Sequence, residues 1–205
     1  FVPPGANIGD ELRVFIYHDS EDRPIATTQN PKGTVGEIVK LVAVSVTPQG
    51  AFLDWGLMKD IFVPRSQQIS LMRTQGAYLV KIYVDEKTGR VAATERFEQD
   101  LNNENLDVKE MDEVQLTVLR RTDIGYLMII NNKYTGVLHF NEIYRNITAG
   151  DQFKGYIKKI YEDNKIDAVA GTAGYKRVED ESEKIIRLLK EHDGYLPYHD
   201  KSNPD

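Results

Sequence analysis

The sequence contains no cysteine, which excludes disulfide bonds, thiolate zinc sites and cysteine nucleophiles. It has no run of about 18 apolar residues, so we expect no membrane-spanning helix and no membrane partner. A Gly-rich phosphate-binding loop and a Gly-x-Ser-x-Gly motif are also absent. The lack of cysteine fits a reducing compartment. These absences direct attention from catalysis to binding.

The best remaining catalytic feature is a pair of His-Asp steps, at residues 192–193 and 199–200. Such pairs occur in metal-dependent phosphohydrolases, where rigid elements hold the ligands at fixed spacing. Here Gly194 and Pro197 interrupt the segment. We therefore interpret it as a loop with incidental histidines, and we predict no enzyme activity, no metal and no cofactor.

The chain repeats one pattern three times, and this repeat determines the fold prediction. Each copy has a short apolar strand, a loop, a longer alternating strand, an acidic turn and a closing strand. The alternating strands lie at 12–19, 78–85 and 153–161, and the closing strands at 23–28, 90–94 and 165–169. The first copy lacks the front half that the others have. Since Phe1 is also not an initiator Met, we expect that the chain lacks its natural N-terminus.

The second and third copies each predict a five-stranded Greek-key barrel of the OB-fold type. In the second copy the strands fall at 38–46, 50–56, 60–64, 77–84 and 90–94, with a long polar connection between the third and fourth. That arrangement is typical of OB-folds. In the third copy, the first three strands are predicted at 114–121, 126–130 and 135–139. The sequence thus predicts a mainly β protein of tandem barrels.

A different pattern follows the third copy. Acidic residues at 180–183, an apolar face over about two turns, and Gly194 predict one amphipathic helix at the start of a truncated domain. We predict five segments: part of a barrel at 1–30, a complete barrel at 31–98, an acidic linker at 99–112, a second complete barrel at 113–178, and the truncated domain at 179–205.

The net charge of −6 argues against a nucleic-acid partner until it is divided along the chain. Residues 31–98 hold nine basic and seven acidic side chains, and residues 119–178 hold ten and six. The segment 99–118 holds one basic and six acidic side chains. Both complete copies are therefore net basic, although ordinary surface variation produces offsets of this size.

Several sequence runs carry a family resemblance. Residues 50–56, 62–64 and 84–94 resemble an S1 RNA-binding domain. Five finer runs together resemble the bacterial conserved virulence factor B family: residues 25–28, 52–57, 129–133, 155–159 and 194–202. This resemblance implies tandem S1 domains followed by a C-terminal winged helix, whose first helix would lie within 179–205. The chain departs from the S1 pattern at Gln49, where an aromatic is usual, and at Ala168, where Leu is usual.

An OB barrel binds single-stranded nucleic acid on the outer face of strands two and three. Phe52 matches the aromatic residue of the S1 face, and its alternation with Asp54 favours exposure over core packing. Trp55 falls on the opposite face, where a core role and base stacking are equally supported. The resemblance also implies binding roles for Arg90 and for its acidic neighbour Asp85.

Other candidate residues are distributed over all three copies. His139 occupies the position of an S1 binding histidine, with a structural or merely exposed histidine equally supported. Arg65 follows strand three, and for both Arg65 and Lys59 a solvated surface charge is the favoured interpretation. Lys165 and Arg23 take the position of Arg90 in their copies. The remaining candidates form a turn cluster and an aromatic–basic stripe: Tyr126, Lys133, Tyr134, Tyr156 and Lys158.

We therefore expect an RNA-binding protein that engages single-stranded or loop RNA through barrel faces. The resemblance implies a cytoplasmic bacterial regulator of RNA metabolism or gene expression. The alternative is an OB-fold module that docks protein partners, through the acidic linker or the winged helix. Salt dependence of RNA binding distinguishes the two. Contacts to phosphates release counterions, so true RNA binding weakens steeply as salt rises, whereas a docking module would bind RNA only weakly.

Overall fold

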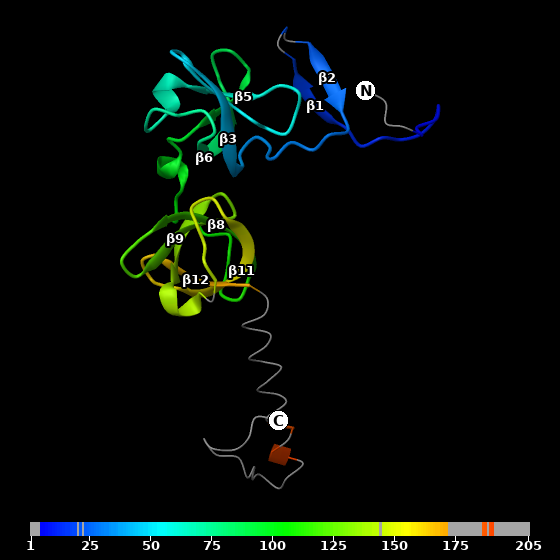
Figure 1. Ribbon diagram of the computed structural model, residues 1–205. Coiled ribbons are helices and arrows are strands. Elements are labelled where there is room, and N and C mark those ends of the chain that lie inside the picture. The colour runs from blue at the N-terminus through cyan, green and yellow to red at the C-terminus, as the bar shows by residue number, and fades with distance from the viewer. Residues whose placement is uncertain are drawn as a thin grey trace.

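The computed structural model describes residues 5–19, 21, 23–143, 145–171, 186–187 and 189–190. Strands account for most of the regular secondary structure in its described part, and they form a two-stranded hairpin and two five-stranded barrels (Figure 1). The hairpin, formed by β1 (Phe15–His18) and β2 (Pro24–Thr27), lies beside the barrel of the second copy, and the barrel of the third copy lies below that barrel in the view of Figure 1. The predicted mainly β fold with tandem five-stranded barrels is confirmed.

The barrel of the second copy is nearly closed, with strand order β5-β4-β3-β6-β7. Its strands are β3 (Ile38–Thr47), β4 (Gly50–Leu53), β5 (Ile61–Pro64), β6 (Ala77–Val84) and β7 (Val91–Thr94). Strands β5 and β7 lie side by side without forming a ladder. The predicted strand 50–56 ends early because Asp54 accepts a 2.8 Å hydrogen bond from the Gly56 amide and Gly56 has a φ of 82°.

The barrel of the third copy is closed, with strand order β10-β12-β11-β8-β9. Its strands are β8 (Glu113–Arg121), β9 (Gly125–Ile130), β10 (Tyr134–His139), β11 (Gln152–Ile160) and β12 (Ile166–Ala170). A short parallel ladder between β10 and β12, in which Val137 faces Asp167, completes the closure. The connections after β5 and β10 each begin with one short 3-10 turn, η1 (Arg65–Gln67) and η3 (Phe140–Glu142).

Each barrel has its own apolar core, and a third cluster joins the two barrels. Ile38 of β3, Phe97 and Ile129 of β9 are buried together, with partly buried leucines around them. The backbone amide of Ile38 donates to Asn132 Oδ1 at 3.0 Å, and its carbonyl accepts from Gln152 Nε2 at 2.9 Å. Apolar burial and directional hydrogen bonds at one place hold the barrels in a defined orientation.

The acidic linker is bound to the third copy instead of forming a free tether. Asn103 donates to the carbonyls of Thr135 and Asn164 at 2.8 and 3.0 Å, and its side-chain oxygen accepts from the Thr135 amide. The Tyr134 hydroxyl bonds to the linker backbone at Asn105 and Asp107. Closer to the second copy, η2 (Glu98–Asp100) forms ion pairs to both barrels, through Arg120 and Lys81.

The hairpin packs on the second copy through aromatic residues. Phe15 and Tyr17 contact the Trp55 indole edge-to-face, with ring centroids 5.7 and 6.5 Å apart. Lys59 adds a polar contact, donating to the carbonyls of His18 and Asp19 at 3.0 and 2.8 Å. Phe15 and Tyr17 therefore share one apolar core with the barrel.

The predicted start of a winged helix, residues 179–205, lies outside the described residues except for positions 186, 187, 189 and 190. The His-Asp steps at 192–193 and 199–200 lie outside them as well. Within the described residues, no helix is long and apolar enough to cross a membrane.

Candidate nucleic-acid interface

Two phenylalanine rings lie together on the outer face of the second-copy barrel. Phe52 of β4 and Phe62 of β5 are directly opposite each other in the ladder, and their ring centroids are 4.9 Å apart. Both side chains are half-buried, while their neighbours Leu53, Ile61 and Val63 point into the core. Strand alternation therefore places an aromatic pair on the surface that OB barrels use for nucleic acid.

Gly50 makes room for this aromatic pair. A Cβ atom at Gly50 would lie 2.3 Å from the Val63 carbonyl oxygen and 2.6 Å from the ring of Phe62. Any side chain at this position would push Phe62 out of place. The turn glycine that begins β4 thus helps to define the aromatic surface.

The aromatic pair forms one wall of a hollow of about 430 Å³, which we call the Phe52 hollow. Its other walls come from the loop before β5, the β6–β7 turn and β7. Basic groups come from Lys59 and Arg90, and acidic groups from Asp60 and Asp85. The predicted residues Phe52, Asp85 and Arg90 are therefore brought together. Phe62 is missed by the sequence prediction, although its alternation with Ile61 and Val63 would have identified it.

Asp85 organises the turn between β6 and β7. Its carboxylate accepts hydrogen bonds from the backbone amides of Lys87 and Thr88 and from the Thr88 hydroxyl. These bonds, the Thr88 hydroxyl foremost, lower the pKa of Asp85 below its ordinary value. The Asp85 amide also donates to the Arg90 carbonyl at 2.9 Å. Asp85 thus holds the backbone that carries Arg90 along the hollow.

Asp60 is an acidic group beside the two phenylalanines. Burial is the main cause that raises its pKa above the ordinary value, and the nearby Asp54 carboxylate adds to the effect. Asp60 also lines a small crevice between the hairpin and the barrel, together with Tyr17 and His18. Its charge opposes the approach of a phosphate to Lys59 and Arg90.

Three other predicted residues lie away from the Phe52 hollow. Trp55 is buried in the core, where its indole donates to the Gly33 carbonyl at 2.7 Å, so its ring has no exposed face for a base. Arg65 is exposed at the start of η1 and does not line the hollow. Arg23 forms ion pairs with Asp19 and Glu21 in the hairpin.

The corresponding face of the third-copy barrel has no aromatic pair. Leu127 and Val137 are the facing residues of β9 and β10, where β4 and β5 carry Phe52 and Phe62. Tyr126 instead packs edge-to-face on Phe140 at 5.7 Å, and the Arg121 guanidinium covers the same Phe140 ring. The two barrels share a fold but present different surfaces.

The predicted polar residues of the third copy are bound to carboxylates. Lys133, Lys158 and Lys165 form ion pairs of 2.5 to 2.6 Å, and each pairing raises the lysine pKa. His139 Nε2 lies 3.1 Å from Asp167 Oδ1, and the Tyr161 hydroxyl donates to the other oxygen. Tyr156 lies 3.3 Å from Glu113 through its hydroxyl.

Tyr134 is buried, with 5% of its surface exposed, and its hydroxyl is bound to the linker. The predicted turn cluster of Tyr126, Lys133 and Tyr134 is therefore not one exposed surface.

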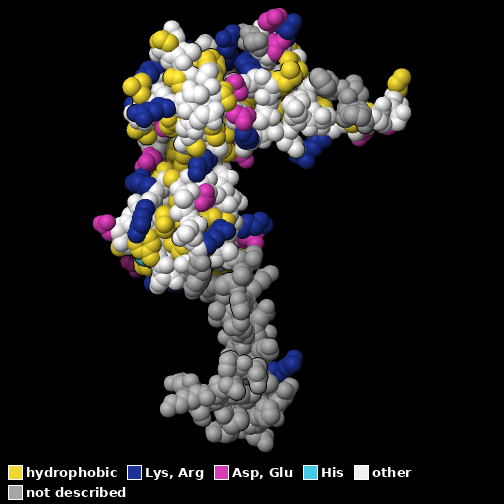
Figure 2. Space-filling view, viewed as in Figure 1, with side chains coloured by type: hydrophobic (Ala, Val, Ile, Leu, Met, Phe, Trp, Pro, Cys, Tyr) yellow, Lys and Arg dark blue, Asp and Glu magenta, His cyan; other side chains and the backbone are white. Residues whose placement is uncertain are grey.

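Figure 2 shows the wider distribution of charge, in which basic and acidic side chains alternate over the visible face of both barrels. Among the described residues, no group of three or more His, Asp or Glu side chains is placed to hold a metal ion.

Comparisons with known proteins show what this chain is similar to. A family model described as an S1 domain matches residues 1–29. Over 205 residues the chain is 25% identical to conserved virulence factor B of Staphylococcus epidermidis, a match that covers 97% of this chain and 69% of that protein. The chain is a distant homologue of conserved virulence factor B. The predicted family resemblance is confirmed.

A protein of the same name from a second Staphylococcus species is also similar to this chain. Conserved virulence factor B of Staphylococcus aureus strain USA300 is 26% identical over 208 residues, covering 97% of this chain and 68% of that protein. A crystal structure of a multidomain protein with nucleic acid binding domains from Streptococcus pneumoniae is 20% identical, with a TM-score of 0.40, and the match covers 97% of this chain and 73% of that one.

Proposed function

We propose that this protein binds single-stranded or loop RNA, and that the Phe52 hollow is its principal contact. The observation that carries the proposal is the pair of half-buried phenylalanine rings beside Lys59 and Arg90. Base stacking on aromatic rings contributes about 1–3 kcal/mol per base and tolerates different bases. Cations at the rim attract the phosphates that follow each stacked base.

The proposal extends to the organisation and setting of the chain. Residues 1–30 form part of an S1-like domain, 31–98 and 113–178 form complete ones, 99–112 link them, and 179–205 begin a winged helix. The protein acts in the bacterial cytoplasm as a regulator of RNA metabolism or gene expression. Relatedness to conserved virulence factor B and the S1 match at the N-terminus support this assignment.

The test is fluorescence anisotropy of a labelled single-stranded RNA, titrated with the protein at several salt concentrations. Phe52→Leu keeps an apolar side chain but removes the ring, and we expect it to weaken binding about tenfold. Phe52→Tyr keeps the ring and serves as the matched control, with affinity close to that of the native protein. Affinity should also fall as salt rises, with a logarithmic slope of roughly −0.7 for each phosphate contact.

Equal affinities for the Leu and Tyr variants, or binding that ignores salt, would overturn the assignment of the Phe52 hollow. Protein docking by the third-copy barrel is a second candidate function. It is favoured by one observation: the predicted lysines there are already paired with carboxylates, so they offer less free charge to phosphates.

A further inference from the structure

The two barrels differ at the end where the connection between the third and fourth strands crosses. In the third copy this end is an apolar hollow of about 380 Å³, which we call the Arg145 hollow. Its size is within the range of small-molecule sites, roughly 300–1,000 Å³. Its apolar walls come from β10, the connection, β11 and β12: Leu138, Ile143, Ile147, Phe153 and Ala170.

The second copy closes the same end with polar contacts. Gln68 is 2% exposed and donates to the Val63 carbonyl, and Met72 is buried beside it. Arg96, just after β7, donates to the carbonyls of Ser66 and Gln68, each at 3.0 Å. These bonds hold the connection across the barrel end.

The third copy has different residues at these places. In each barrel, one backbone hydrogen bond joins the first strand to the end of the connection. The Ala43 amide donates to the Gly76 carbonyl in the second copy, and the Val118 amide donates to the Asp151 carbonyl in the third. Counting back from them, Ile143 takes the place of Gln68, and Ile147 that of Met72. Ala93 pairs with Ile82 in one barrel, and Ala168 pairs with Ile157 in the other, so these two alanines occupy equivalent positions. Three residues after each alanine, the second copy has Arg96 and the third copy has Gly171. Without the glutamine and the arginine, the connection is not tied down and the hollow stays open.

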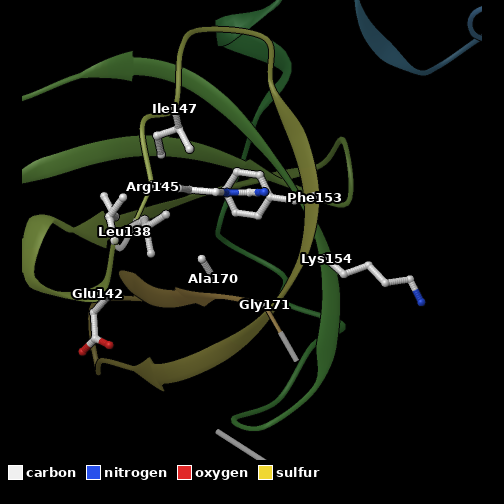
Figure 3. A pocket seen from close by; sticks show the side chains of 9 residues that line it. Leu138, Glu142, Arg145, Ile147, Phe153, Lys154, Ala170 and Gly171 are labelled. Carbon is white, nitrogen blue, oxygen red and sulfur yellow. The ribbon is translucent and has the colours of Figure 1, made fainter. Parts of the chain in front are cut away.

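Arg145 supplies the charge of this hollow. Its guanidinium lies over the Phe153 ring, 4.6 Å from the centroid, and Figure 3 shows the side chain reaching across the hollow to that ring. Within the described part of the chain it forms no ion pair within 4 Å. The pKa of Asp151 is lowered mainly by its hydrogen bonds from Thr148, and the charges of Lys40 and Arg145 add to that effect.

The other charged residues of the rim are engaged elsewhere. Lys154 pairs with Glu113 at 2.7 Å, and Glu142 with Lys158 at 2.5 Å. Both side chains point away from the hollow in Figure 3. An apolar floor with one guanidinium above it is complementary to a ligand that has an apolar body and one anionic group.

We propose that the Arg145 hollow binds a small organic anion. The carboxylate or phosphate of the ligand pairs with the guanidinium of Arg145. Its aromatic or branched aliphatic body lies against Ile143, Ile147 and Phe153. This site is separate from the Phe52 hollow and does not require RNA.

The test uses 8-anilinonaphthalene-1-sulfonate, an aromatic anion whose fluorescence rises in apolar sites, followed in parallel by amide chemical shifts of the labelled full chain. We expect saturable binding, with shifts concentrated at Ile147, Phe153 and Ala170. Arg145→Gln should weaken binding about tenfold, since hydrogen bonds to charged groups contribute more than neutral ones. Ala170→Phe should fill the hollow and abolish binding.

Lys159→Met is the matched control, because it removes an exposed cation of the same strand that does not line the hollow. Its affinity for the probe should equal that of the native protein. Equal weakening by Lys159→Met and Arg145→Gln would show a general charge effect and overturn the site. Shifts located on another surface would overturn it as well. Arg145→Gln, an exposed substitution, keeps the test valid should Ala170→Phe fail to fold.

Competition separates the two ligand chemistries and the two sites. Phenyl phosphate and phenylacetate should each displace the probe, and the stronger competitor identifies the preferred anion. A single-stranded RNA should leave the bound probe in place. Displacement by RNA together with loss of binding in Phe52→Leu would assign the probe to the Phe52 hollow and overturn the proposal.

Discussion

Asn132 Oδ1 accepts a hydrogen bond from the backbone amide of Ile38, at 3.0 Å and across 94 residues of sequence. Asn132 belongs to the β9–β10 turn, where Asn131 and Asn132 both have left-handed backbones, with φ of 51° and 58°. Asparagine tolerates that conformation better than most residues. One turn residue therefore shapes its own barrel and fixes the neighbouring one.

We expect Asn132→Gly to loosen the contact between the barrels. Glycine keeps the left-handed turn but removes the bond to Ile38, which should lower the free energy of unfolding by about 1 kcal/mol. Urea unfolding measures the loss, and residual dipolar couplings measure the relative orientation of the barrels. Asn164→Gly is the control, since Asn164 also has a positive φ, of 60°, in a turn. If both variants keep the native couplings, the bond does not orient the barrels.

Trp55 should prove structural. Trp55→Phe removes the indole bond to the Gly33 carbonyl and should cost about 1–3 kcal/mol in unfolding free energy, while RNA affinity stays unchanged. Trp55 is the only tryptophan, so its fluorescence is a direct probe. Saturating RNA should leave its emission unaltered. Strong quenching by RNA would instead indicate that the ring reaches the ligand.

Asp60 should make stability depend on pH. Its pKa is raised in the folded protein from the ordinary value of 3.8, so the folded state holds this proton more tightly than the unfolded chain. Its contribution to the free energy of unfolding is therefore present below pH 3.8 and is lost as pH rises through the raised pKa. Asp60→Asn removes this loss, so the variant should gain stability relative to the native protein as pH rises.

Thermal unfolding of both proteins between pH 3 and pH 7 measures that difference. Asp163→Asn is a control of opposite sign, because Lys165 lowers the pKa of Asp163. A gap between native protein and Asp60→Asn that stays constant with pH would show that Asp60 does not titrate abnormally. The same variant should bind RNA more tightly, since a negative charge leaves the Phe52 hollow.

Arg96 should hold the end of the second-copy barrel closed. Arg96→Ala removes two hydrogen bonds to the connection, so we expect a loss of about 2 kcal/mol in unfolding free energy and additional binding of 8-anilinonaphthalene-1-sulfonate. Arg73→Ala, which truncates an exposed arginine within the connection itself, is the control. Equal stability of the two variants would show that the bonds of Arg96 do not hold the connection in place.

Strand positions followed from sequence because alternation and turn residues are local signals. The ranges 38–46 and 77–84 agree closely with β3 and β6, and the alternation of Phe52 with Asp54 predicted that Phe52 lies on the outer face. The end of β4 was placed too late, because the hydrogen bond from Gly56 to Asp54 closes a turn that strand composition does not reveal. For a similar reason, sequence left the role of Trp55 open between core and binding face and placed Tyr134 in a binding cluster. Both are buried by distant segments, the hairpin and the linker.

The sequence by itself determined the repeat, the barrels and the aromatic character of one face, because period-two patterning and turn chemistry act between near neighbours. Only the tertiary structure decided which cations remain available to a ligand, since the carboxylates that pair with Lys133 and Lys158 lie 26 and 16 residues away. It also decided that one barrel end is sealed and the other open. That difference depends on two positions, Gln68 and Arg96 in the second copy and Ile143 and Gly171 in the third. Those positions are far apart in the sequence and come together only in the folded barrel.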